Sequence, residues 1–203
     1  MKIICIGRNY VAHANELNNP VPAQPVFFMK PDTALLPHRN PFFYPDFSKD
    51  IHYEVELVIK INKNGRHIAE KFAHKYYDEI SVGIDFTARD LQARCKEKGL
   101  PWEIAKAFDF SAPVGSFKAV SEFKDKNNIP FSLKINNEIR QRGNSGNMIF
   151  SFDQIIAYVS QFVTLRSGDL IFTGTPEGVG PAKMEDHFEL FLADEKLLEF
   201  NVK

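Results

Sequence analysis

This chain of 203 residues has few cysteines, a single tryptophan and almost no net charge. It has two cysteines, one tryptophan, and 25 basic against 26 acidic residues, which leaves a formal net charge of −1. We expect Cys5 and Cys95 to be reduced packing residues, because the thiols of cytosolic proteins rarely pair. A balanced charge offers no attraction for nucleic acid or another polyanion, so we expect no such partner.

Long apolar runs are also absent. No stretch approaches the roughly 20 residues that a membrane-spanning helix needs. The apolar stretch within residues 1–8 is too short for the core of a secretion signal. We therefore expect a cytoplasmic protein with no membrane partner. The 44% of hydrophobic residues, with 19 phenylalanines, can bury a substantial core. The length fits one domain over 1–203, with or without a mobile lid.

The pattern of apolar residues predicts many strands and few helices. Residues 20–49 contain seven prolines, which favour loops and edge strands, and 66–77 are expected to form a short helix or loop. Because the expected strands do not alternate regularly with helices, the pattern predicts an α+β fold and not a doubly wound sheet. Strands are expected near 3–6, 52–61, 80–86, 131–135, 170–173, 188–192 and 197–202. Helices are expected over 88–98 and after 151, and a short helix or turn over 10–17.

Capping and turn residues mark where several of these elements begin. Thr87 with Asp90 three residues later forms a capping-box pattern at the start of the helix over 88–98. Ser151 and Gln154 form a second such pattern before an amphipathic helix. The pair Asn136-Asn137 can supply the positive φ angles of a tight hairpin turn after the strand over 131–135.

Three acidic residues are the strongest functional signal. In the run His52 to Ile59 side chains alternate between two faces, so Glu54 and Glu56 project together. Asp85 ends the separate apolar run over 80–84. If the two strands are neighbours, three carboxylates converge in an apolar setting, which favours a hard divalent cation such as Mg²⁺ or Mn²⁺. The alternative is two solvated glutamates on an edge strand and an aspartate that caps a turn.

Two further groups have catalytic potential. His13 and Glu16 lie three residues apart, so a helix places them on one face, and a carboxylate that orients a histidine favours a general base. Lys106 lies in an apolar segment and requires an anion from the protein or a substrate. The alternatives are two solvated residues on a surface helix and a lysine whose ammonium extends to water.

The loop over 174–181 contains three glycines and two prolines. The loop lacks the Gly-Lys-Ser/Thr ending of a phosphate-binding loop, so it is not one. Its backbone N–H groups and the Thr175 hydroxyl can bind a carboxylate; the alternative is a structural turn.

Together these segments resemble the fumarylacetoacetate hydrolase family, in particular its short acylpyruvase members. The resemblance extends over nearly the whole chain. Its motifs are Gly7-Arg8-Asn9-Tyr10 with His13 and Glu16, Phe28-Met29-Lys30-Pro31, His52-Tyr53-Glu54-Val55-Glu56-Leu57, Asp85-Phe86-Thr87-Ala88-Arg89-Asp90, Lys98-Gly99-Leu100-Pro101-Trp102, Lys106, Met148-Ile149-Phe150-Ser151, and Thr173-Gly174-Thr175-Pro176 with Gly178-Val179-Gly180-Pro181.

This resemblance implies a mixed β-sandwich or β-roll with flanking helices, and a homodimer. It implies that the three carboxylates bind Mg²⁺ or Mn²⁺, and that His13 and Glu16 form a dyad on a lid over 10–20. Lys106, Gln92 and Thr175 match positions that contact the substrate or position water. Longer members carry an extra N-terminal domain, which this chain is expected to lack.

The activity implied is hydrolysis of the C–C bond of 3-acylpyruvates to pyruvate and a carboxylic acid. Decarboxylation of oxaloacetate is expected as a second reaction, because both reactions release a pyruvate enolate. One alternative is an isomerase or tautomerase of 2-oxo or 2-hydroxy-dienoic acids, including the keto and enol forms of oxaloacetate. The other is a non-catalytic protein that binds a metabolite or a metal.

Overall fold

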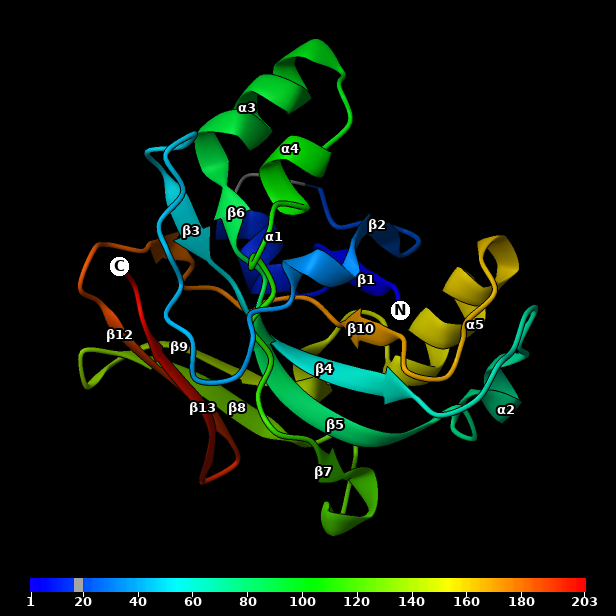
Figure 1. Cartoon of the computed structure of the whole chain (residues 1–203). Helices are drawn as coiled ribbons and strands as arrows, with labels where there is room; N and C mark the ends of the chain where they lie inside the picture. The colour runs from blue at the N-terminus through cyan, green and yellow to red at the C-terminus, as the bar shows by residue number, and fades with distance from the viewer. Residues whose placement is uncertain (17–19) are drawn as a thin grey trace.

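Three β-sheets and a few short helices make up the computed structural model of this protein (Figure 1), which describes residues 1–16 and 20–203. The described strands are β1 (Ile3–Gly7), β2 (Val26–Lys30), β3 (Ile51–Tyr53), β4 (Val55–Ile61), β5 (Tyr77–Ile84), β6 (Thr87–Ala88), β7 (Lys118–Ala119), β8 (Pro130–Ile135), β9 (Glu138–Asn144), β10 (Leu170–Phe172), β11 (Gly180–Pro181), β12 (His187–Leu192) and β13 (Glu195–Asn201). The described α-helices are α1 (Val11–Glu16), α2 (Glu70–Ala73), α3 (Arg89–Lys98), α4 (Glu103–Lys106) and α5 (Phe152–Phe162).

The largest sheet has the order β2-β1-β10-β4-β5-β7, and only its β1–β10 pair is parallel. A four-stranded antiparallel sheet has the order β13-β12-β8-β9, and a small sheet has the order β11-β3-β6. This mixed α+β architecture agrees with the fold class predicted from the sequence. Among the described residues no helix is long and apolar enough to cross a membrane.

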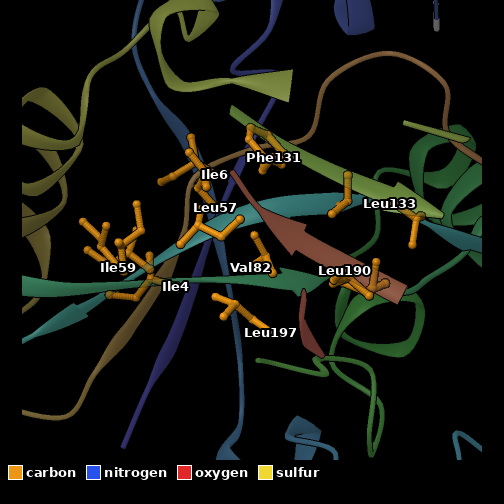
Figure 2. Packing of buried hydrophobic residues seen from close by; sticks show 14 of the residues in the cluster. Ile4, Ile6, Leu57, Ile59, Val82, Phe131, Leu133, Leu190 and Leu197 are labelled. Atoms are coloured by element: carbon orange, nitrogen blue, oxygen red, sulfur yellow. The ribbon is translucent and has the colours of Figure 1, made fainter. Parts of the chain in front are cut away.

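The main hydrophobic core lies between the six-stranded and four-stranded sheets. Strands β8 and β12 alternate buried and partly exposed residues, so each presents one apolar face to this core. Strand β4 is buried almost throughout, as expected for a central strand covered on both faces. Figure 2 shows nine labelled core residues that converge from both sheets: Ile4, Ile6, Leu57, Ile59, Val82, Phe131, Leu133, Leu190 and Leu197.

Several local predictions are confirmed. Asn136 and Asn137 have φ angles of 53° and 67° and connect β8 to β9, as a tight hairpin turn requires. The Ser151 hydroxyl accepts a hydrogen bond from the Gln154 N–H, and the Gln154 side chain accepts one from the Ser151 N–H. This reciprocal cap starts α5.

The predicted N-cap at Thr87 is wrong. Thr87 lies in β6, and α3 begins two residues later at Arg89 without a side-chain cap. The cause is tertiary pairing: β6 pairs with β3, and the Arg89 N–H donates to the Asp50 carbonyl. The Asp90 carboxylate instead accepts hydrogen bonds from Ser48 Oγ and the Leu91 N–H.

The predicted bounds of the first helical segment and of β5 differ from the observed bounds by a few residues. The short helix or turn expected over 10–17 is a helix, α1. The last residue of that prediction, and positions 18–19 of the lid predicted over 10–20, lie outside the described residues. Strand β5 begins at Tyr77, three residues before the predicted start. Cys5 and Cys95 are both free and buried, as predicted.

Candidate active site

A cavity opens where β1, β4, β5, α1 and α3 approach one another. Its lining includes every residue that the sequence marked for function except Glu16. The predicted carboxylates, base, lysine and two substrate contacts therefore lie around one space, although they span more than 160 positions of the chain. The predicted residues in the lining are His13, Glu54, Glu56, Asp85, Gln92, Lys106 and Thr175.

Pairing of β4 with β5 brings the three carboxylates together. Val55 lies opposite Ile84 and Glu56 opposite Gly83, and the Asp85 N–H donates to the Glu54 carbonyl at 2.9 Å. Each of the three carboxylates has an oxygen within 4.8 Å of one on each of the others, and all three residues are buried. Glu54 lies between β3 and β4, so the strand is interrupted there and the continuous strand expected over 52–61 does not form.

The expectation that these carboxylates would have an almost purely apolar setting is wrong. Lys106 Nζ lies 2.8 Å from both Glu54 Oε2 and Asp85 Oδ2. Lys30 Nζ lies 2.8 Å from Asp85 Oδ1, and Arg89 Nη2 lies 2.6 Å from Glu54 Oε1. Lys106 does find its anion in the protein, whereas sequence reasoning assigned no role to Lys30 or Arg89. Two features of the sequence could have indicated these residues. Lys30 is a charged residue at the end of an apolar segment, and Arg89 begins the helix that follows Asp85.

The cations compensate the negative charge of Glu54 more than that of Glu56, as the directions of their pKa shifts indicate. Burial alone would raise the pKa of Glu54, but Lys106 and Arg89 hold it well below its usual range. Burial raises the pKa of Glu56 well above its usual range, and the neighbouring Asp85 and Glu54 raise it further. The Gly174 N–H donates to Glu56 Oε2 at 2.7 Å, which opposes this rise. Glu56 is therefore the carboxylate with the strongest uncompensated repulsion.

These residues fit a hard divalent cation. The donor set is three carboxylates, which suits Mg²⁺ or Mn²⁺. Lys30 Nζ, which lies 2.8 Å from Asp85 Oδ1, also donates to the Phe86 carbonyl and to Ser111. No ion pair joins Glu56 to a cation of the described residues, and a bound cation would relieve the repulsion that Asp85 and Glu54 exert on it.

The predicted dyad of His13 and Glu16 has the required geometry. His13 is buried on α1, and its Nδ1 lies 3.2 Å from Glu16 Oε2. An ionised carboxylate only accepts hydrogen bonds, so Nδ1 donates and the lone pair lies on Nε2. Glu16 Oε1 also accepts from the Gly178 N–H at 3.0 Å. The base is thus oriented by a carboxylate that is itself held by the glycine-rich loop.

That loop binds carboxylates of the protein itself. Besides Gly178, Gly174 donates to Glu56, and its φ of 102° favours glycine. A Cβ on Gly174 would lie 2.6 Å from the Asn9 Cβ. The loop therefore fixes one member of the acidic cluster and one member of the dyad.

The two remaining predicted residues are also held by neighbours. Gln92 Oε1 accepts from Arg89 Nη1 at 2.8 Å. Thr175 Oγ1 accepts from Gln141 Nε2 at 2.9 Å. Gln141 was not predicted; it lies on an edge strand of another sheet, and nothing in its local sequence shows that this strand reaches the cavity.

The fold and the cavity define an α+β protein with a buried acidic cluster beside an oriented histidine. The family model "Fumarylacetoacetate (FAA) hydrolase C-terminal" matches residues 2–203. The chain belongs to this family of enzymes, as the sequence motifs predicted.

Relatives with assigned reactions narrow the chemistry. The chain is 41% identical to the mitochondrial oxaloacetate tautomerase of Bos taurus, over 99% of this chain and 91% of that protein. It is 42% identical to an oxaloacetate tautomerase of Escherichia coli, over 91% and 85% respectively. It is also similar to the crystal structure of fumarylpyruvate hydrolase from Pseudomonas aeruginosa in complex with Mn²⁺ and pyruvate, with a TM-score of 0.94, 39% identity, and coverage of 100% of this chain and 89% of that one.

Proposed function

We propose that this protein is a divalent-metal-dependent enzyme that interconverts the keto and enol forms of a small 2-oxo acid, with oxaloacetate as the first candidate substrate. The observation that carries the proposal is one oriented histidine facing three clustered carboxylates in a single cavity. The names of the curated relatives support it. The sequence favoured hydrolysis of 3-acylpyruvates as the main reaction, and we retain that reaction as the second candidate.

Glu54, Glu56 and Asp85 would hold Mg²⁺ or Mn²⁺. When bound, the cation supplies a Lewis acid that favours negative charge on the 2-oxo oxygen. His13 Nε2 accepts the proton from the carbon next to the ketone, and Glu16 stabilises the imidazolium that results. Returning this proton to the enolate oxygen completes the conversion, so atoms and charge balance without another reactant.

The neighbours of the dyad define the other roles that we propose. Thr175 Oγ1 accepts from Gln141, which leaves its hydroxyl proton free to donate to a substrate carboxylate. Lys106 uses two hydrogens on Glu54 and Asp85 and so fixes the orientation of both carboxylates. Gln92, held by Arg89, presents its amide group to the same cavity.

The test compares His13→Ala with His74→Ala, an exposed histidine remote from the cavity. With Mg²⁺ or Mn²⁺ present, we expect wild type to accelerate the loss of enol oxaloacetate absorbance. His13→Ala should slow this step by about 10²–10⁴-fold, the usual contribution of general acid–base catalysis, and His74→Ala should not. Absence of enol conversion by wild type, or a fully active His13→Ala variant, contradicts the proposal.

Acylpyruvate hydrolysis is favoured by one observation, the His13–Glu16 dyad, because hydrolysis needs a base to activate water. We expect release of pyruvate and acetate from acetylpyruvate if this second candidate is right. His13→Ala should then abolish hydrolysis while sparing oxaloacetate decarboxylation more, since decarboxylation needs no attacking water. Equal loss of the two reactions contradicts this role of His13.

The assembly and location of the protein remain part of the proposal. We propose a homodimer that binds a small 2-oxo acid, and a cytoplasmic location. The exposed side chains of Phe43 and Phe47 support an interface between two copies. Sedimentation velocity at micromolar concentration should give the mass of two chains, and a single-chain mass contradicts the dimer.

A further inference from the structure

The cavity contains more positive charge than its carboxylates need. Its lining has three carboxylates and four permanent cations, namely Arg8, Arg89, Lys96 and Lys106. Arg89 and Lys106 are paired with the acidic cluster, whereas no ion pair joins Arg8 or Lys96 to any carboxylate of the described residues. A bound divalent cation would increase this surplus, so the cavity favours a ligand with more than one negative charge.

Helix α3 arranges one row of polar residues along the cavity. Arg89, Gln92 and Lys96 follow one another by three and four positions, so they share a face of the helix. Arg89 reaches Glu54 at the inner end. The backbone of Lys96 lies about 10 Å from that of Arg89 along the helix axis, at a rise of about 1.5 Å per residue. Because it is exposed and yet lines the cavity, Lys96 lies at the cavity mouth.

The Arg8 side chain enters the same cavity from β1 through an unusual backbone conformation. Arg8 has a φ of 60°, which is costly for a residue with a Cβ and clusters at functional sites. The next residue, Asn9, holds this backbone in place. Its amide donates to the Phe150 and Thr173 carbonyls and accepts from the Phe150 N–H. The backbone at Arg8 is therefore held by the buried hydrogen bonds of Asn9.

Arg8 and Lys96 act on each other electrostatically. Burial lowers the pKa of Lys96 from its usual value, and the nearby Arg8 and Arg89 lower it further. Lys96 Nζ also lies 5.7 Å from the centre of the Trp102 ring. Two cations that repel each other in the lining of one cavity are stabilised by an anion between them.

We propose that Arg8 and Lys96 form a subsite for the second carboxylate of a dicarboxylic 2-oxo acid. This inference rests on the proposed function, in which the acidic cluster holds a cation for the 2-oxo oxygen and Thr175 donates to the first carboxylate. It makes oxaloacetate a better ligand than acetylpyruvate, which has a methyl ketone in place of that carboxylate.

The experiment uses this matched pair of ligands and the fluorescence of Trp102, the only tryptophan. Trp102 lines the cavity, so its fluorescence after rapid mixing reports binding before turnover, in wild type and in variants loaded with Mg²⁺ or Mn²⁺. We expect Lys96→Gln to raise the Kd for oxaloacetate at least fivefold and that for acetylpyruvate less than twofold. Lys96→Arg should restore the preference, and Lys98→Gln, an exposed lysine on the same helix, should change neither Kd.

Arg8→Gln provides the second arm, with thermal unfolding to establish that the variant is folded. A folded variant should lose affinity for oxaloacetate selectively, and the loss should shrink at high salt. Equal weakening of both ligands, or no change in either variant, overturns the subsite and leaves the proposed function standing. If wild type binds neither ligand, the proposed function fails and the subsite fails with it.

Discussion

At the scale of single residues, Gln141 connects the acidic cluster to the glycine-rich loop. The Val55 N–H donates to Gln141 Oε1 at 2.9 Å, between the two glutamates of the cluster. Gln141 Nε2 donates to Thr175 Oγ1 and to the Pro176 carbonyl, both at 2.9 Å. Because a backbone N–H only donates, the amide has one orientation, and the Thr175 hydroxyl is forced to accept from it.

We therefore expect Gln141→Met to cost stability and activity together. Removing the amide leaves the buried Val55 N–H without its acceptor, at a cost of about 1–3 kcal/mol in the free energy of unfolding. Freed from Gln141, the Thr175 hydroxyl loses its fixed direction, so KM should rise more than kcat falls. Urea unfolding and steady-state kinetics check both effects. Gln161→Met, at an exposed position, is the control, and identical behaviour of the two variants contradicts this role.

At the scale of secondary-structure elements, α1 depends on contacts outside itself. It has six residues, and helices this short are not stable alone in water. Glu16 at its end joins it to the glycine-rich loop through the Gly178 N–H and holds His13. The position of the base therefore depends on one carboxylate that bridges two elements.

Glu16→Ala should loosen both elements while the rest of the fold is retained. We expect faster hydrogen exchange at the amides of α1 and at Gly178, measured by mass spectrometry on peptides that cover residues 11–16 and 174–181. Peptides from β4 and β5 should be unchanged. Glu177→Ala, an exposed neighbour in the same loop, should leave exchange as in wild type. Unaltered exchange in the Glu16→Ala protein would falsify the bridge.

Secondary-structure elements also show which parts of the fold and of the site could be predicted from the sequence. Alternation and caps placed β8, the Asn136-Asn137 turn and the start of α5, since each depends on residues next to one another. The break at Glu54 and the start of α3 were missed, because pairing of β3 with β6 decides them. The acidic cluster was predictable as soon as β4 and β5 were taken as neighbours. Its compensation by Lys30 was not, since Lys30 ends the edge strand β2, four strands away from β5, which Asp85 follows.

At the scale of the whole molecule, the acidic cluster joins parts of the fold that are distant in sequence. Glu54 precedes β4, Glu56 lies in it and Asp85 follows β5, while the cations that pair with Glu54 and Asp85 come from β2, α3 and α4. Native structure is therefore required to form the site. A cation that binds only the folded protein stabilises it by about 2.7 kcal/mol at a hundred times its Kd.

Metal loading should consequently raise the unfolding temperature of wild type, by roughly 5–10 °C for a chain of this size. Glu56→Gln tests the origin of the effect, since it removes the carboxylate whose pKa is raised by burial and by its acidic neighbours. Without metal, this variant should be more stable than wild type, because the repulsion disappears and the Gly174 N–H keeps an acceptor.

With Mg²⁺ or Mn²⁺, the Glu56→Gln variant should gain little and wild type should become the more stable protein. Calorimetry in EDTA and at a series of metal concentrations measures this reversal directly. Glu79→Gln, on β5 but half-exposed and paired with Lys60, is the matched control and should keep the wild-type response to metal. If metal stabilises wild type and Glu56→Gln equally, the cation binds elsewhere and the three carboxylates are not its ligands.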